Sequence, residues 1–290
     1  MNVLNIKEKQ NIIFQIVVAG TGGNGSIFVR SMLHTISSFR ASSKRKNISF
    51  DITLVDGDKV ERKNFHRQLF DQDDLGEYKV VSLRERYGDY YGIKVKTVTE
   101  YCKSIEMLSN LFDDADLDIE HNVQVVPILF GFVDNNKTRQ LFDAFFHSQE
   151  IDNLIWIDAG IEGVLIFDNP TPENMQMIDY SGFGGQVVCG YKYHGQVIMD
   201  PVTRVYTNML EDEKTFFPDQ SCGDTIINNP QRLGTNLMAA QMTLPFFNNL
   251  LHNNSIYTHK INFNAQFAQS KPTFVSSDMV ATYNSLKKNF

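Results

Sequence analysis

Over the first 160 positions, short continuous apolar runs alternate with longer stretches in which apolar residues recur at helical spacing. Residues 12–19 (IIFQIVVA) form a β-branched run that is typical of a buried strand. Residues 26–39 have helical spacing, and residues 49–58 (SFDITLVDGD) form a second apolar run that ends in acids. A strand, a glycine turn, a helix and a strand in this order predict the opening of a βαβ unit.

The same alternation continues to residue 160. Helical spacing predicts helices at residues 79–87 and 136–149 and a helix and loop within residues 104–122. Apolar runs predict three further strands, at residues 93–101, 123–134 and 153–160. Strands that alternate with helices indicate an α/β fold with a mainly parallel sheet covered on both faces.

Beyond residue 160 the pattern changes. Residues 161–210 are rich in glycine, β-branched and aromatic residues, which favours short antiparallel strands. A long helix should begin near residue 229 and be kinked by Pro245. Its apolar stripe consists of Leu233, Leu237, Ala240, Leu244, Phe247 and Leu251. Residues 255–290 suggest one final strand (KINFNAQF) and a polar tail.

No linker or repeat divides the chain, so we expect a single domain over residues 1–290. It would comprise a nucleotide-binding half at residues 12–160 and an antiparallel and helical half at residues 161–290. The chain carries 27 basic against 34 acidic side chains, a formal charge of −7, which argues against a broad nucleic-acid-binding surface.

The spacing of the cysteines and the lengths of the apolar runs indicate the cellular compartment in which the protein is expected. The three cysteines form no CxxC pair, which excludes the usual zinc ribbon and a disulfide scaffold and suits a reducing compartment. The sequence contains no secretory signal pattern and no run of about 20 apolar residues. We therefore expect a cytoplasmic protein without a membrane partner.

The turn after the first strand is the first candidate for chemistry. Gly20, Gly22 and Gly25 satisfy GxGxxG between a strand and a helix, where backbone amides and the helix dipole favour a phosphate. The alternative is a turn that only packs the helix on the sheet. The common interpretation of this fingerprint is a nicotinamide or flavin enzyme, in which Asp56 or Asp58 would bind ribose.

A polar cluster downstream of the second strand favours a triphosphate instead. A dehydrogenase does not need such a cluster, whereas a guanidinium and an ammonium suit phosphate oxygens. Arg62 and Lys63 are better explained as part of a solvated loop. The cluster that remains consists of Asn64, Arg67, Gln68 and Lys79.

Five ordered motifs within residues 12–160 resemble the signature of the ThiF/E1-like superfamily, of the ubiquitin-activating and MoeB/ThiF type. These proteins are ATP-dependent activators of ubiquitin-like and sulfur-carrier proteins. The motifs are GTGGNG at 20–25, DGDKVERKNFHRQ at 56–68, GEYK at 76–79, DNNKTR at 134–139 and DAG at 158–160. The resemblance implies a Rossmann-like adenylation fold with an antiparallel C-terminal extension.

The resemblance also implies roles for individual residues. Asp56 would hold the ribose hydroxyls, Arg67 and Lys79 would be catalytic through the charge they place on the triphosphate, and Asp134 would bind Mg²⁺. An alternative role for Asp134 is the N-cap of the helix near residue 136. The implied ATP-binding set is Gly20, Gly22, Gly23, Gly25, Asp56, Asp58, Asn64, Arg67, Gln68 and Lys79.

Cys222 occupies the place where family members that proceed beyond the adenylate carry a cysteine, just before a long helix. Its thiolate would accept the acyl group as a thioester, although Asp219 and Asp224 oppose a lowered pKa. The alternative is a buried structural thiol. Cys102 and Cys189 lie in strand-like surroundings and are expected to be structural.

Some features depart from the family. No CxxC pair is present for a structural zinc, and the only basic residues before position 25 are Lys7 and Lys9, where many relatives carry an arginine that completes the partner subunit's site. No histidine spacing suggests a metal, although His66 adjoins Arg67. The chain resembles the minimal stand-alone bacterial type, such as that of the PRTRC systems.

The implied activity is ATP- and Mg²⁺-dependent adenylation of the C-terminus of a small ubiquitin-like or sulfur-carrier protein. An E2-like protein and a second copy of the chain are the further expected partners. The alternatives are a tRNA-modifying dehydratase of the same superfamily, an NAD(P)-binding oxidoreductase and a scaffold without catalytic activity.

Overall fold

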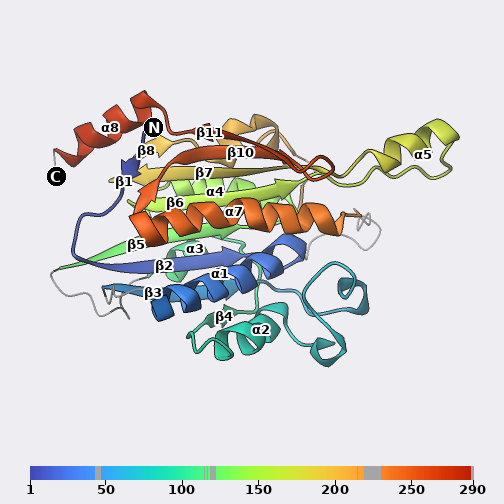
Figure 1. Ribbon diagram of the computed structural model, residues 1–290, viewed down its shortest axis with the longest axis horizontal. Coiled ribbons are helices and arrows are strands. Elements are labelled where there is room, and N and C mark those ends of the chain that lie inside the picture. The colour runs from blue at the N-terminus through green and yellow to red at the C-terminus, as the bar shows by residue number, and fades with distance from the viewer. Residues whose placement is uncertain are drawn as a thin grey trace.

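A single sheet runs through the molecule in the computed structural model, which describes residues 1–42, 47–113, 115, 117, 122–213, 215–218 and 230–288. Its strands lie in the order β11-β10-β7-β6-β5-β2-β3-β4, and β8 also pairs with β7 (Figure 1). The strand bounds are β2 Asn11–Ala19, β3 Ile48–Val55, β4 Lys96–Val98, β5 Val123–Gly131, β6 Leu154–Ile161, β7 Gly184–Tyr193, β8 Gln196–Met199, β10 Thr258–Asn264 and β11 Gln269–Phe274. A separate pair joins β1 (Leu4–Asn5) to β9 (Ser255–Ile256).

The strands from β4 to β6 are parallel, as predicted. Strand β2 lies at the centre, where Ala19 is opposite Val55 of β3 on one side and Gly131 of β5 on the other. Because parallel strands share a direction, the segments that follow β2, β3, β5 and β6 all emerge at one edge of the sheet. We call this edge the carboxyl edge.

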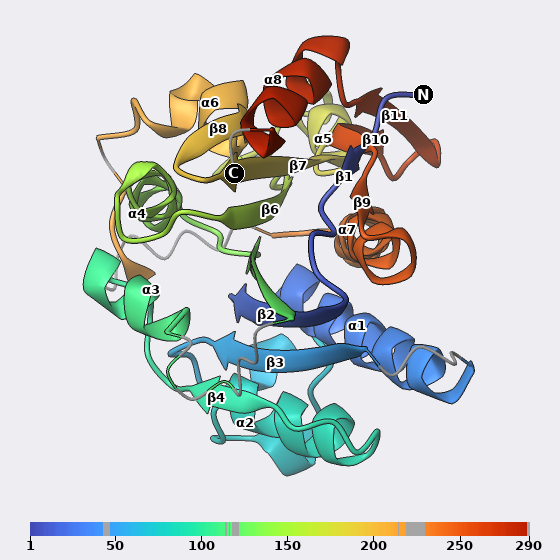
Figure 2. The same cartoon turned by 90° about the vertical axis from the view of Figure 1, so that its left-hand side faces the viewer.

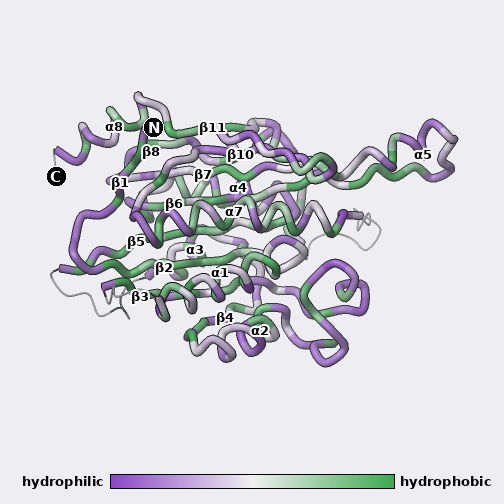
Figure 3. Tube along the Cα trace, viewed as in Figure 1, coloured by the Kyte–Doolittle hydropathy of each residue, from purple (hydrophilic) through white to green (hydrophobic). Residues whose placement is uncertain are grey.

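Helices cover both faces of the sheet (Figure 2). One face carries α1 (Gly23–Ser42) and α7 (Leu233–Asn253), with α2 (Lys79–Leu83) continued by a π-helical segment at Arg84–Asp89. The other face carries α3 (Ile105–Leu111), α4 (Asn136–His147) and α6 (Val202–Val205). Alternate residues of β2 serve the two layers, since Phe14, Ile16 and Val18 pack with α1 and α7, whereas Val17 and Ala19 pack with α4. The central strands are correspondingly hydrophobic (Figure 3).

The C-terminal half adds the antiparallel strands that the sequence predicts. Strand β7 pairs antiparallel with β6 and β10, and β10 pairs antiparallel with β11. The prediction of one final strand at residues 260–267 is wrong, because β10 ends at Asn264. The Asn264 carboxamide oxygen accepts hydrogen bonds from the backbone amides of Gln266 and Phe267, and this turn reverses the chain into β11.

Three helices fall outside the sequence prediction, and α6 is one of them because it lies in the region predicted as short strands. Helix α8 (Ser277–Lys287) lies in the predicted polar tail and begins at Ser276, whose hydroxyl accepts from the Met279 amide. Helix α5 (Pro172–Asp179) has no buried residue and projects from the body on an arm between β6 and β7 (Figure 1). The amphipathic spacing of α8 is weak and α5 packs no face against the core, and in both segments the capping residues are the clearest signal of a helix.

The predicted apolar stripe of α7 is correct only in its later turns. Ala240, Phe247 and Leu251 are buried, but Leu233 and Leu237 are 47% and 41% exposed. The first turns bury Thr235 and Asn236 instead. The helix continues through Pro245, and a kink there stays a prediction. Among the described residues, none of the helices combines the length and the apolar content needed to cross a membrane.

Candidate nucleotide site at the carboxyl edge

The glycine turn connects β2 to α1 and requires glycine where the chain packs most tightly. Gly20 has φ +89°, and a Cβ there would lie 2.7 Å from the carbonyl oxygen of Phe132. A Cβ on Gly25 would lie 2.1 Å from the carbonyl oxygen of Gly20. These contacts let α1 begin directly after the strand, so its first amides lie at the carboxyl edge.

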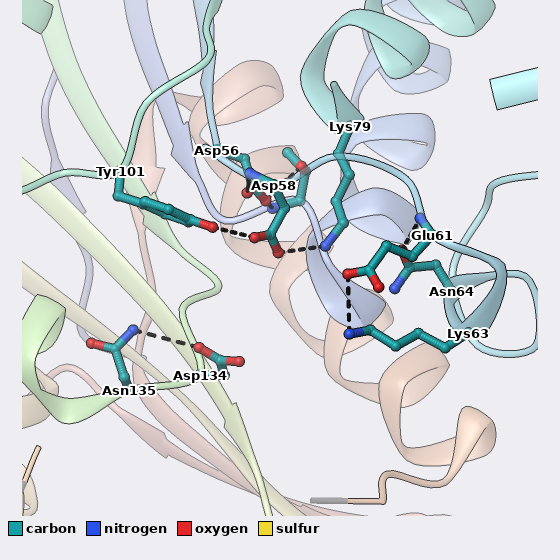
Figure 4. A network of polar contacts seen from close by, with 10 residues as sticks. Asp56, Asp58, Glu61, Lys63, Asn64, Lys79, Tyr101, Asp134 and Asn135 are labelled. Atoms are coloured by element: carbon teal, nitrogen blue, oxygen red, sulfur yellow. Dashed lines mark hydrogen bonds and ion pairs between the residues drawn. The ribbon is translucent and has the colours of Figure 1, made fainter. Parts of the chain in front are cut away.

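Asp56 fastens this turn to the end of β3. Its Oδ2 accepts from the backbone amide of Thr21 at 2.6 Å and from the Thr21 hydroxyl at 2.8 Å, and its Oδ1 accepts from the Asp58 amide at 2.9 Å. Burial raises the pKa of Asp56, and the nearby Lys79 ammonium opposes that rise. The carboxylate for which the family resemblance implies a ribose contact therefore holds the glycine turn in place (Figure 4).

Asp58 and Lys79 form an ion pair beside this turn. The Lys79 Nζ lies 2.6 Å from Asp58 Oδ2; the lysine side chain is only 6% exposed, but the aspartate side chain is 46% exposed. Burial alone would raise the pKa of Asp58, but the Lys79 ammonium outweighs it and lowers that pKa. The buried Lys79 ammonium is therefore paired with a carboxylate that is about half exposed to solvent (Figure 4).

Tyr101 is part of this site and was missed in the sequence. Its hydroxyl donates a hydrogen bond to Asp58 Oδ1. Gly57 makes room for the ring, because a Cβ there would lie 2.8 Å from it. The only signal in the sequence is a tyrosine at the end of the predicted strand at residues 93–101.

The polar cluster after β3 folds back toward the glycine turn. Asn64 is 3% exposed, and its Oδ1 accepts from the Glu61 amide at 2.7 Å, which organises the short 3₁₀ helix Arg62–Asn64. Gln68 reaches the turn, since its Nε2 is 3.9 Å from the position of a Cβ on Gly22. Lys63 is exposed and pairs with Glu61 at 3.0 Å, in keeping with a solvated loop.

Asp134 is exposed at the carboxyl edge, two residues beyond Phe132. The alternative that Asp134 caps α4 is wrong, because Asn135 is the N-cap and its Oδ1 accepts from the Thr138 amide at 2.8 Å. The Asn135 side chain also donates to Asp134 Oδ1 at 3.4 Å. One outward carboxylate that shares an ion with phosphates is a usual Mg²⁺ site, so the residues fit the predicted metal. No cluster of three protein ligands occurs among the described residues.

The two remaining motifs form a sealed ion pair. The Arg139 Nε lies 2.9 Å from Asp158 Oδ1, and the two side chains are 8% and 1% exposed. The same guanidinium donates to the carbonyl oxygen of Val133 at 2.7 Å. This pair therefore braces the backbone beside Asp134.

Asn236 brings the second half of the chain to the glycine turn. Its Oδ1 would lie 2.8 Å from a Cβ on Gly23, so only glycine at that position admits the side chain. Nothing in the sequence distinguishes Asn236 from the other polar residues of α7.

The cysteines contribute no exposed thiol to this site among the described residues. Cys222 lies outside the described residues. Cys102 and Cys189 are buried, as predicted, and burial together with the Asp56 carboxylate raises the pKa of Cys102 to about 12. Burial also raises the pKa of Cys189. His66 is exposed.

Several solved structures are similar to this chain. PaaA aligns with a TM-score of 0.54 at 17% identity, and E. coli MccB with succinimide aligns with a TM-score of 0.53 at 15% identity. Each alignment covers 92% of this chain and 64% of the other, so the chain spans under two thirds of these relatives. E. coli MccB with MccA-N7isoASN aligns with a TM-score of 0.50 at 14% identity, over 90% of this chain and 64% of the other.

These likenesses confirm the predicted α/β fold. A comparison with curated protein sequences finds no match. The family model described as "ThiF family" matches residues 9–275, which include the glycine turn, both aspartates after β3 and the whole sheet. The chain therefore belongs to the ThiF family.

Proposed function

We propose that this protein binds ATP and Mg²⁺ and adenylates a carboxylate, namely the C-terminus of a small ubiquitin-like or sulfur-carrier protein. One observation carries the proposal: the buried Lys79 ammonium is held at 2.6 Å by the half-open Asp58, next to the glycine turn. A phosphate oxygen can take the place of the carboxylate without leaving the ammonium unpaired. The ThiF family match supports the same activity.

The nucleotide would lie across the carboxyl edge. Asp56 would accept a ribose hydroxyl at Oδ1, because each carboxylate oxygen offers about two acceptor positions and the three present hydrogen bonds leave one on that oxygen. The amides of the glycine turn, with Asn64, Gln68 and Arg67, would bind the phosphates. Asp58 would orient Lys79 in the absence of nucleotide.

Adenylation is a displacement at the α-phosphorus. A carboxylate oxygen of the partner forms a bond to that phosphorus, the bond to the oxygen bridging to the β-phosphorus breaks, and pyrophosphate leaves with the electron pair. Negative charge accumulates on the phosphoryl oxygens and the departing pyrophosphate. Lys79 and Arg67 would stabilise this charge from fixed positions.

Asp134 would hold the metal. Mg²⁺, when bound, supplies positive charge to the phosphates and helps the leaving group depart. The Arg139 contact to Val133 fixes the backbone that leads to Asp134. Asn135 keeps its own side chain in the cap of α4 and so leaves the Asp134 carboxylate outward.

ATP–pyrophosphate exchange tests the proposal. The partners to test would be any small proteins ending in Gly-Gly that neighbouring reading frames are found to encode. Exchange should require ATP, Mg²⁺ and one of these proteins, and Asp134→Ala should reduce it by at least tenfold. Asp89→Ala is the matched control, since it removes an exposed carboxylate at the far end of the segment that begins with Lys79.

Each alternative predicts a different outcome. Exchange that depends on tRNA and not on a protein would favour the tRNA-modifying alternative. Binding of NAD without ATP would favour an oxidoreductase. Undiminished exchange by Asp134→Ala would count against the metal assignment.

The later step at Cys222 is a separate proposal. The thiolate would attack the acyl carbon of the adenylate, a thioester bond would form, and AMP would leave. A partner adduct that a thiol reductant removes should appear on non-reducing electrophoresis. The same adduct in Cys222→Ala would contradict this assignment.

A further inference from the structure

The glycine turn is enclosed by a side chain from α7 whose polar atoms have no partner. Asn236 is 0% exposed, and its Oδ1 and Nδ2 would lie 2.8 and 3.0 Å from a Cβ on Gly23. Neither atom has a hydrogen-bond partner among the described residues. Buried amides are nearly always paired, because an unpaired one is costly.

Two other amides at the same turn share this property. Asn24 Oδ1, in the first turn of α1, and Gln68 Oε1, whose side chain reaches Gly22, are both buried and lack a partner within the part of the chain that is described. Asn24 lies in α1, Gln68 in the segment after β3 and Asn236 in α7, so three segments bring amide side chains with unpaired atoms near the glycine turn. Elsewhere in α7 the buried polar groups are paired; the Thr235 hydroxyl donates to the carbonyl oxygen of Gly182 at 2.8 Å.

A purely structural role does not account for Asn236. An apolar side chain of the same size would fill the space against Gly23 without leaving two polar atoms unpaired. A ligand with acceptor oxygens at the start of α1 would supply the partner that Asn236 Nδ2 lacks. The three unpaired oxygens, Asn236 Oδ1, Asn24 Oδ1 and Gln68 Oε1, need donors instead. The positive end of the helix and its free amides select an anion with several acceptor oxygens.

We propose that Asn236 is a nucleotide-binding residue whose Nδ2 donates a hydrogen bond to a phosphate oxygen of ATP at the glycine turn. The proposal rests on the proposed function and extends it to the second half of the chain. The amide is enclosed in the free protein, so the phosphate reaches it through a local shift of the turn. Glycines at positions 20, 22 and 23 permit such a shift.

Two substitutions test the proposal with Mg²⁺-ATP and adenosine as the ligands, measured by isothermal titration calorimetry. Asn236→Leu should weaken ATP binding by roughly tenfold, equivalent to about 1.4 kcal/mol, and leave adenosine binding unchanged. The melting temperature of the free protein should stay the same or rise, because the unpaired amide is gone. Asn236→Asp should weaken ATP binding further, because its carboxylate repels the phosphates.

Asn249→Leu is the matched control. It removes a half-buried amide from the same helix, about three and a half turns further along, and should leave ATP binding unchanged. A merely structural role gives the opposite pattern for Asn236→Leu, namely a lower melting temperature with ATP affinity retained. That result would overturn the proposal.

The remaining outcomes are also decisive. Wild-type affinity in Asn236→Asp would mean that the amide oxygen pairs with backbone donors of the turn, which overturns the phosphate contact. Normal ATP binding by the wild type with unchanged affinity in both variants would overturn this inference and leave the proposed function intact. Absence of ATP binding by the wild type would overturn both.

Discussion

Two carboxylate–cation pairs lie at the carboxyl edge of the same sheet, and they differ mainly in access to solvent. Asp58 and Lys79 are 2.6 Å apart, and the carboxylate side chain is 46% exposed. Asp158 and Arg139 are 2.9 Å apart, and both side chains are at most 8% exposed. Both pairs come from motifs that resemble one family signature, so the motifs alone do not tell them apart.

This difference in solvent exposure suits the Asp58–Lys79 pair to ligand binding and the Asp158–Arg139 pair to a structural role. The open pair can exchange its carboxylate for a phosphate, because Asp58 can turn to water while Lys79 stays neutralised. The sealed pair cannot exchange its carboxylate in this way, because separating Asp158 from Arg139 would leave a buried charge unpaired. Arg139 instead uses its second contact to hold Val133. Under the proposed function, only the pair whose carboxylate is half exposed would take part in chemistry.

Removing the sealed carboxylate should have the largest effect on stability. Asp158→Ala leaves Arg139 buried without its partner and should lower the free energy of unfolding by about 3–5 kcal/mol. Asp58→Ala is the comparison and should cost less, because water that fills the place of the half-exposed carboxylate can reach the Lys79 ammonium. Urea denaturation of both variants measures the difference. Equal losses would remove the distinction between the two pairs.

Removing the open cation should affect activity rather than stability. Lys79→Met should lower ATP–pyrophosphate exchange by about 10²–10³-fold, since the transition-state charge loses a fixed stabilising group. Its urea midpoint should shift far less than that of Asp158→Ala. Lys63→Met, which removes an exposed cation paired with Glu61, should retain exchange. Retained exchange in Lys79→Met would refute the role proposed for the open pair.

The sequence predicts the first half of the fold well because each element there has its own local signal. Residues 12–19 are apolar and β-branched, and they form β2 with both faces buried. The residues of α8 have weak amphipathic spacing and α5 packs no face against the core, so the caps are the clearest signal of both helices. The turn at Asn264 depends on side-chain hydrogen bonds within an apparently continuous strand pattern.

The residues of the candidate site also fall into those that the sequence predicts and those that it does not. Residue types in fixed order predict which side chains belong to it, among them Asp56, Asp58 and Lys79. Order along the chain does not indicate which carboxylate will be sealed, because burial depends on strands that meet only in the folded sheet. Tyr101 and Asn236 escape prediction for the same reason, since each reaches the site from a distant segment.

A smaller effect should follow from removing one hydroxyl at the open pair. Tyr101→Phe deletes the hydrogen bond to Asp58 Oδ1 and should lower the free energy of unfolding by about 1 kcal/mol. Tyr90→Phe is the control, because that tyrosine is 79% exposed. Urea denaturation of the two variants provides the measurement. A loss as large as that of Asp158→Ala would mean that the open pair is sealed after all.

The smallest effect is the dependence of stability on pH, and here the two pairs should differ in sign. Lys79 lowers the pKa of Asp58, so its contribution is present above the unfolded value of about 3.9 and is lost as the pH falls through the folded value. Burial raises the pKa of Asp158, whose Oδ2 has no partner among the described residues. That contribution is fully present below about 3.9 and is lost as the pH rises through the folded value.

Two variants make these opposite signs measurable. The stability difference between wild type and Asp58→Asn should shrink as the pH falls below about 4, whereas the difference for Asp158→Asn should grow. Urea denaturation of the three proteins over a pH series measures both slopes. Slopes of the same sign would show that both carboxylates lie in similar surroundings. Slopes of opposite sign would show that the cation dominates the surroundings of Asp58 and that burial dominates those of Asp158.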